Sequence, residues 1–219
     1  MAISQVVVLS GYGACPSGSM LPVAQLYTSM DGGLTWAETH RSVSGGFPAL
    51  VHSSGKYVAL GDAGDLVTSS DAQTWLCAGA GCTSDACADG FRSVVAWGDD
   101  VLAAGGVGFC EPVKRLDGGT FALRTATEDW RVVPADIGVV HGVSVGVSTG
   151  VAVGDGWVGS SPDGHDWQLQ EIPTTRALES VAWGAGTFVA VGVEGEMLSS
   201  PDGVVWSALW SRTDEDLDL

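Results

Sequence analysis

The sequence predicts an all-β fold, a β-propeller of five blades with four antiparallel strands each. Three features predict it: a short turn pattern that recurs along the 219 residues, short Val, Ala and Leu runs separated by glycine, and no sustained helical spacing of apolar residues. Short apolar runs with glycine breaks are typical of strands joined by hairpin turns. Four such strands in a unit of about forty residues describe a propeller blade.

The recurring turn pattern ends in a tryptophan. It appears as SMDGGLTW (29–36), SSDAQTW (69–75), SPDGHDW (161–167) and SPDGVVW (200–206), with a degenerate copy, RTATEDW, at 124–130. The separations between successive closing tryptophans are 39, 55, 37 and 39 residues. A period near 40 residues indicates a repeat architecture. The closing residues are Trp36, Trp75, Trp130, Trp167 and Trp206.

The repeat extends upstream of each turn and sets the expected blade boundaries. Residues 180–206 align with 49–75 and 142–167, and residues 93–105 begin an interrupted copy. The segment QVVVLSG (5–11) matches the second strand of the last unit, so the innermost strand of the first blade is either missing or supplied from elsewhere. The C-terminal tail is too acidic to supply it, and we therefore expect imperfect closure. A single domain at 1–210 should hold blades at about 1–40, 41–78, 88–134, 138–173 and 176–210, followed by an acidic tail at 211–219.

The composition argues against several classes of function. Nine Lys and Arg residues oppose 26 Asp and Glu residues, which gives a net charge of −17. Binding to nucleic acid or to an anionic membrane surface is not expected, because both require a basic protein surface. No apolar stretch approaches the ~18 residues of a membrane-spanning helix, so membrane insertion is not expected either. Residues 1–10 do not form a recognisable signal peptide, because they lack a basic n-region and a clear cleavage site.

The first turn matches a known family pattern at every defined position. In S-x-D-x-G-x-T-W, the matching residues are Ser29, Asp31, Gly33, Thr35 and Trp36, and the other copies fit the shorter form S-x-D-G-x-x-W. The chain therefore resembles the Asp-box (bacterial neuraminidase repeat, sialidase-like) β-propeller family. That family includes sialidases, sortilin-type receptors and noncatalytic assembly factors. The resemblance implies that these turns join the third and fourth strands of each blade and lie away from the catalytic face.

The residues of the pattern have a local physical role in a turn. The aspartate can accept hydrogen bonds from the backbone N–H groups that follow it, glycine supplies the positive φ, and the tryptophan buries a large ring between sheets. We favour this structural role over a ligand or cation role. The residues expected to have it are Ser29, Asp31, Gly33, Trp36, Asp71, Trp75, Asp163, Gly164, Trp167, Asp202, Gly203 and Trp206.

No catalytic residue, metal site or cofactor is predicted. A sialidase-like site would need three arginines gripping a carboxylate, a Tyr–Glu nucleophile pair and an Asp acid/base. The seven arginines do not recur at matched blade positions, and no nucleophile elbow, phosphate-binding loop or HExxH motif is present. His52 is expected to pack near the inner strands. The tryptophans outside the turns are expected in the core (Trp97 and Trp183) or available to stack on sugars (Trp157 and Trp210).

The five cysteines map to one rim of the predicted propeller, opposite the Asp-box turns. Three of them, in the pattern C-x4-C-x4-C, lie in an insertion between the second and third blades. Disulfides are favoured over free buried thiols and over a metal cluster, because the spacing departs from the C-x2-C of structural zinc sites. The candidate disulfide residues are Cys15, Cys77, Cys82, Cys87 and Cys110.

The same rim carries the longest insertions, at 12–23, 76–91 and 107–121. Loops on a rigid fold commonly carry binding residues, although these insertions could also be tolerated decoration. Lys114 and Arg115 form a basic pair on an acidic chain and are the candidate binding residues of this rim. The alternative is that they only offset neighbouring acidic residues.

Together these features favour a noncatalytic binding or assembly module that recognises a glycan or a protein surface. A structural component of a larger extracellular or virion assembly also fits, and an extracellular or virion-surface location is favoured over the cytoplasm because Asp-box folds usually occur outside it. A glycoside hydrolase of sialidase-like fold is the alternative. Both functional expectations rest on fold-level analogy.

Overall fold

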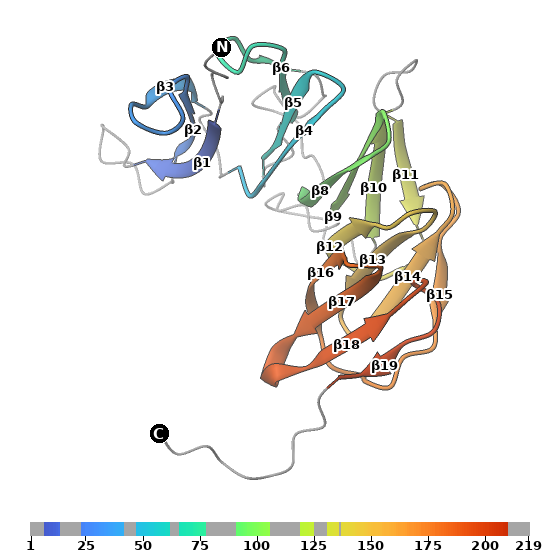
Figure 1. Ribbon diagram of the computed structural model, residues 1–219. Coiled ribbons are helices and arrows are strands. Elements are labelled where there is room, and N and C mark those ends of the chain that lie inside the picture. Colours follow the sequence, from blue (N-terminus) through green and yellow to red (C-terminus); the bar gives the residue numbers. More distant parts are fainter. Residues whose placement is uncertain are drawn as a thin grey trace, which may run out of the picture.

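The described strands of the chain form five antiparallel sheets that follow one another in sequence order (Figure 1). The computed structural model describes residues 7–13, 23–41, 47–61, 66–77, 91–105, 119–124, 131–135 and 137–209. Apart from one 3-10 turn at Val193–Gly195, this part of the chain contains no helix. It also contains no helix long and apolar enough to cross a membrane. The predicted all-β class is confirmed.

Each sheet is a simple meander in which every strand pairs with its neighbours in sequence. The first sheet holds β1 (Val7–Gly13), β2 (Val23–Ser29) and β3 (Ala37–Arg41). The second holds β4 (Ala49–Ser53), β5 (Lys56–Leu60), β6 (Leu66–Ser69) and β7 (Leu76–Cys77). The third holds β8 (Phe91–Trp97), β9 (Asp100–Gly105), β10 (Gly119–Arg124) and β11 (Arg131–Ala135). The fourth holds β12 (Val140–Val145), β13 (Gly150–Gly154), β14 (Trp157–Ser161) and β15 (Gln168–Gln170), and the last holds β16 (Leu178–Gly184), β17 (Thr187–Gly192), β18 (Met197–Ser200) and β19 (Ser207–Ala208).

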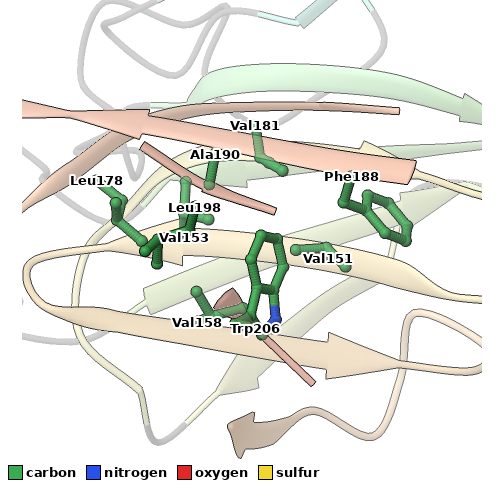
Figure 2. Packing of buried hydrophobic residues seen from close by; sticks show 9 residues of the cluster. All are labelled: Val151, Val153, Val158, Leu178, Val181, Phe188, Ala190, Leu198 and Trp206. Carbon is green, nitrogen blue, oxygen red and sulfur yellow. The ribbon is translucent and has the colours of Figure 1, made fainter. Parts of the chain in front are cut away.

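Apolar side chains pack between successive sheets and form the core. Figure 2 shows the cluster between the fourth and last sheets, where the ring of Trp206 lies among aliphatic side chains. Residues on alternate positions of one strand face opposite sides, so each inner sheet can bury one face against the sheet before it and the other against the sheet after it. The fourth sheet contributes Val151, Val153 and Val158, and the last sheet contributes Leu178, Val181, Phe188, Ala190, Leu198 and Trp206.

Of the tryptophans outside the turns, Trp97 and Trp183 pack against the core, as expected. Trp97 is partly buried and packs against the cluster between the third and fourth sheets, and Trp183 packs against the cluster of Figure 2. Trp157 joins the same cluster as Trp97, whereas Trp210 lies outside the described residues. His52 lies on the inner strand β4, as expected, with its ring 4.3 Å from the ring of Tyr57, and it is exposed there.

The first sheet lacks an inner strand among the described residues. In β1, Val7 pairs with Ser29 just as Phe188 of β17 pairs with Ser200, so β1 has the register of a second strand. The sheets run along an open arc, with β1–β3 at one end and β16–β19 at the other (Figure 1). No described sheet precedes the first one. For this reason Trp36 is 38% exposed, whereas Trp75 and Trp206, which have a preceding sheet, are 9% and 6% exposed. The expectation of a buried ring was wrong for Trp36.

Candidate functional site

The Asp-box turns join the third and fourth strands and are held by hydrogen bonds within each turn. In the last sheet, Asp202 Oδ1 accepts bonds from the backbone N–H groups of residues 204–205, at 2.8 and 2.9 Å. Ser200 Oγ accepts a 2.8 Å bond from the Gly203 N–H group, and Trp206 Nε1 donates to the Gly203 carbonyl oxygen at 3.1 Å. The acceptor capacity of Asp202 is thus used by the backbone of its own turn.

These bonds also set the electrostatics of the turns. In the first turn, the Thr35 hydroxyl donates a 2.6 Å bond to Asp31 Oδ2, and the hydrogen bonds from Thr35 lower the pKa of Asp31 to about 2. In the second turn, backbone bonds led by that from Thr74 lower the pKa of Asp71 to about 2. A carboxylate that accepts several hydrogen bonds is stabilised in its charged form. Backbone hydrogen bonds likewise lower the pKa values of the other two aspartates, Asp163 and Asp202.

The second turn is additionally tied to the first sheet. Thr28 Oγ1 donates a 2.5 Å bond to the carbonyl oxygen of Ala72, and Trp75 Nε1 donates to Thr39 Oγ1 at 3.2 Å. Ala72 stands where the three other described turns have glycine, and its φ of 59° lies in the left-handed region. A residue with a Cβ atom is strained there, so this turn keeps the shared geometry at an energetic cost.

The opposite ends of the sheets form a second surface, which we call the opposite rim. It comprises the starts of the inner strands, the loops between second and third strands, and the connections between sheets. On it a chain of hydrogen bonds crosses from the third sheet to the fourth. Arg92 Nη1 lies 3.0 Å from His141 Nδ1, and His141 Nε2 lies 2.9 Å from Asp155 Oδ1.

The backbone explains why these side chains meet. Arg92 and His141 are the bulge residues of the inner strands β8 and β12, where the pairing register shifts. A bulge residue is left out of the ladder and its side chain is re-aimed. Asp155 lies in the hairpin between β13 and β14, which a bridge from Asp155 to Ala177 fixes in place. The equivalent bulge residue of the last sheet is Glu179.

The chemistry of the three groups fixes the proton of the imidazole. The guanidinium of Arg92 can only donate, so His141 Nδ1 accepts and His141 Nε2 carries the hydrogen that is donated to Asp155. Both ring nitrogens are therefore occupied, and His141 could serve as a base only by breaking one of these bonds. The arrangement instead orients Arg92, which is exposed and whose remaining N–H groups have no acceptor among the described residues.

A second charged group lies on the same rim. Arg176, in the connection before β16, contacts Glu194 and Glu196 in the loop between β17 and β18, each at 3.1 Å. This arginine is half-exposed, but two carboxylates already neutralise it. Arg92, whose bonded partner is a histidine, is thus the better positioned of the two to meet an anionic or carbonyl group.

Most of the predicted rim residues lie outside the described part of the chain. Cys77, at the end of β7, forms a disulfide, and the chain's other four cysteines, one of which must be its partner, all fall outside the described residues. The candidate basic pair Lys114 and Arg115 falls outside them as well, so its role stays a prediction. The described residues contain no group of three or more side chains that could hold a metal ion.

Arg92, His141 and Asp155 were not singled out by the sequence. The signal was a weak one: three of the four described inner strands place a polar residue directly after their first buried apolar residue, as in Phe91–Arg92, Val140–His141 and Leu178–Glu179. These polar side chains meet only because a bulge re-aims them, and neither composition nor residue spacing predicts a bulge.

Comparison with known proteins identifies the fold but no family. No protein-family model and no curated protein matches the chain, so membership of the Asp-box family stays a prediction. Solved structures do match. "YCF48 bound to D1 peptide" is 17% identical with a TM-score of 0.58, over 84% of this chain and 59% of that one. This chain thus spans about three fifths of that protein's length.

Two further structures agree in fold. A nidogen/laminin complex is 9% identical with a TM-score of 0.56, over 81% of this chain and 70% of that one. A catalytically inactive virginiamycin B lyase from Staphylococcus aureus, with quinupristin, is 10% identical with a TM-score of 0.67, over 95% of this chain and 75% of that one. These structures are β-propeller-like, and the predicted β-propeller is supported at that level.

Proposed function

We propose that this protein is a noncatalytic, five-bladed β-propeller that binds a protein or peptide surface through its opposite rim. The domain is proposed to span residues 1–210, with the blade boundaries given above. The binding group we assign within the described residues is Arg92, oriented by His141 and Asp155.

One observation carries the proposal: Arg92 is exposed, yet its position is fixed by a bond to His141, whose side chain is only 12% exposed and is itself bonded to Asp155. A side chain that is ordered before binding loses less conformational entropy when it meets a partner. Its free N–H groups suit a backbone carbonyl or a carboxylate of a partner chain. The Asp-box face offers less, because the carboxylates there are engaged with their own turns.

The similar structures lend support of a general kind. Two of their names record a bound peptide or protein, namely YCF48 with a D1 peptide and nidogen with laminin. A lyase also shares the fold, but nothing among the described residues of this chain favours a lyase or glycosidase reaction. Recognition of a glycan, and a place in a virion, stay predictions.

The test uses a peptide selected from a random displayed library against the full chain. Arg92→Glu should weaken binding of the selected peptide roughly tenfold or more, because the donor is replaced by a repelling charge. His141→Leu should weaken it less, since Arg92 remains but is no longer oriented. The measurement is isothermal titration calorimetry at low and moderate salt.

The control variant carries His165→Ala and Asp166→Ala, two exposed positions on an Asp-box turn. It should bind as the wild type does. Binding that is lost in this variant and kept in Arg92→Glu would put the site on the wrong face. Selection of glycans but no peptide from parallel arrays would replace the protein partner with a sugar, and release of a product would make the protein an enzyme.

Two untested expectations attach to this proposal. The variant Lys114→Glu, Arg115→Glu should also bind its partner more weakly, with an effect that fades as salt rises. An extracellular location is supported by the disulfide at Cys77, because disulfides persist in oxidising compartments.

A further inference from the structure

The described contacts between sheets use one set of positions. The third and fourth sheets each present two alternate residues of the second strand and one residue of the third strand to the sheet that follows, and the second sheet presents two residues of its second strand in the same way. In these positions all described side chains of the second, third and fourth sheets are 0% exposed. They are Val58 and Leu60 in the second sheet, Leu102, Ala104 and Phe121 in the third, and Val151, Val153 and Val158 in the fourth.

In the last sheet, no further described sheet packs against the same set of positions. The equivalent residues are Val189, Val191 and Met197, since Val191 pairs with Met197 as Val153 pairs with Val158. Val191 is 38% exposed and Met197 is 37% exposed, whereas their equivalents are fully buried. We call this surface the open face. Its other described side chains are uncharged, namely Ser180, Ala182, Thr187, Ser199, Ser207 and the 48% exposed Leu209, whose N–H donates to the Met197 carbonyl oxygen.

The first sheet lies at the other end of the arc, and no described sheet packs against its outer side (Figure 1). Tyr27 and Trp36 hold the positions of Leu198 and Trp206, the residues through which the last sheet receives the fourth. Tyr27 is partly exposed, and no described sheet packs against the exposed ring of Trp36. The first and last described sheets therefore each leave a face uncovered, and these two unlike faces match each other by position.

We propose that the open face of one copy binds the first sheet of a second copy of this chain. The packing would continue the inter-sheet contact that the chain already makes between its own sheets. A second copy is the occupant because Figure 1 places the first and last sheets of one chain at opposite ends of the arc. Such a contact is head-to-tail, so it builds either a ring or an extended series of copies.

Charge sets the conditions under which this contact forms. The chain carries a net charge of −17, and copies repel one another at low salt. Among the described residues the open face carries no charged side chain, and on the facing side of the first sheet Glu38 and Arg41 form an ion pair with each other. Association should therefore become stronger as ionic strength rises, because salt screens the repulsion and leaves the apolar contact.

The test is sedimentation velocity of the full chain across a wide concentration range. The wild type should shift from monomer to larger species with concentration, and more so at high salt. Val191→Glu, on the open face, and Trp36→Lys, on the first sheet, should each be monomeric. Their equimolar mixture should form a dimer and nothing larger, because one intact pair of faces remains. The association constant of each variant alone should fall roughly tenfold or more.

Controls keep the outcome decisive. Leu169→Lys changes an exposed residue of β15 away from both faces and should assemble as the wild type does. Met197→Lys repeats the open-face change should Val191→Glu fail to fold, and circular dichroism checks each variant. A wild type that stays monomeric at every concentration overturns the proposal. This includes a monomer in which the two faces of one chain contact each other, which would shield Trp36 from a fluorescence quencher. Assembly by Trp36→Lys alone would indicate packing of two open faces and overturns it equally.

Discussion

At the scale of single residues, the Asp-box aspartates act as backbone caps. Asp202 supplies the acceptor that two consecutive N–H groups of its turn would otherwise lack. The loss of a comparable capping side chain at a helix end costs about 1–2 kcal/mol, and we expect Asp202→Ala to lower the free energy of unfolding by about that amount. Urea melts measure it. Asp166→Ala, an exposed neighbour in the fourth turn, is the control, and equal losses in both variants would contradict the capping role.

Glycine has two separable roles in the turns of the last sheet, as the β16–β17 hairpin and the Asp-box turn show. Gly186 and Gly203 share a φ of about +80°, but a Cβ atom on Gly186 would meet nothing within 4 Å, whereas one on Gly203 would lie 2.6 Å from Val151 Cγ2. Gly186→Ala should therefore cost only the left-handed strain, about 1–2 kcal/mol. Gly203→Ala should cost an additional ~1–3 kcal/mol for overpacking. Denaturant melts of both variants measure the difference in unfolding free energy. Equal losses in the two variants would show that the fourth sheet shifts to accommodate the added Cβ atom without an energetic penalty.

Residue-level patterns are also where the sequence was most informative. Ser200, Asp202 and Trp206 have mutually dependent roles within seven residues, so their spacing alone predicts the turn. The Arg92–His141–Asp155 network could not be predicted in the same way. Arg92 and His141 are 49 residues apart and meet only because adjacent inner strands each carry a bulge.

At the scale of elements, the position of a sheet in the series decides how much its tryptophan contributes. Trp206 is buried between the fourth and last sheets, and Trp206→Ala should cost about 3–5 kcal/mol. Trp36→Ala should cost clearly less, because its ring is exposed on one side. Both are measured in denaturant melts at low protein concentration. Similar costs would mean that another surface covers Trp36, and a Trp206 cost below ~1 kcal/mol would contradict the packing of Figure 2.

The same contrast shows why the exposure of Trp36 could not be predicted from the sequence. Trp36 belongs to the turn that matches the family pattern most fully, yet it is more exposed than Trp75, Trp167 and Trp206. Local pattern sets the conformation of the turn, whereas burial depends on whether another sheet precedes it. That information lies in the arrangement of the whole chain.

At the scale of the whole molecule, the disulfide at Cys77 limits the number of free thiols. Five cysteines with at least one disulfide leave at most three thiols, and the odd number leaves at least one. Thiol titration under denaturing, nonreducing conditions should therefore give one or three. Cys77→Ser should cost roughly 2 kcal/mol if the closed loop is small, as a pairing with Cys82 or Cys87 would make it. Five reactive thiols would exclude the disulfide in the purified protein.

Stability of the whole molecule should depend on pH through the Asp-box turns. Their aspartates have folded-state pKa values below the ordinary 3.8, at about 2 for Asp31 and Asp71. A depressed pKa means that the unfolded chain binds more protons between these values. The contribution of the turns is thus fully present above pH 3.8 and is lost as pH falls toward about 2.

Replacing Asp31 and Asp71 together by Asn should make the melting temperature less sensitive to pH in this window, while lowering it at neutral pH. The control is Asp166→Asn, which should keep the steep decline of the wild type. Melting temperature followed by circular dichroism from pH 5 to pH 2 measures both, at one fixed ionic strength because the net charge changes over the same range. An Asp31→Asn, Asp71→Asn variant that declines as steeply as the wild type would place the acid sensitivity in other carboxylates, and the turns would then hold the sheets without governing their response to acid.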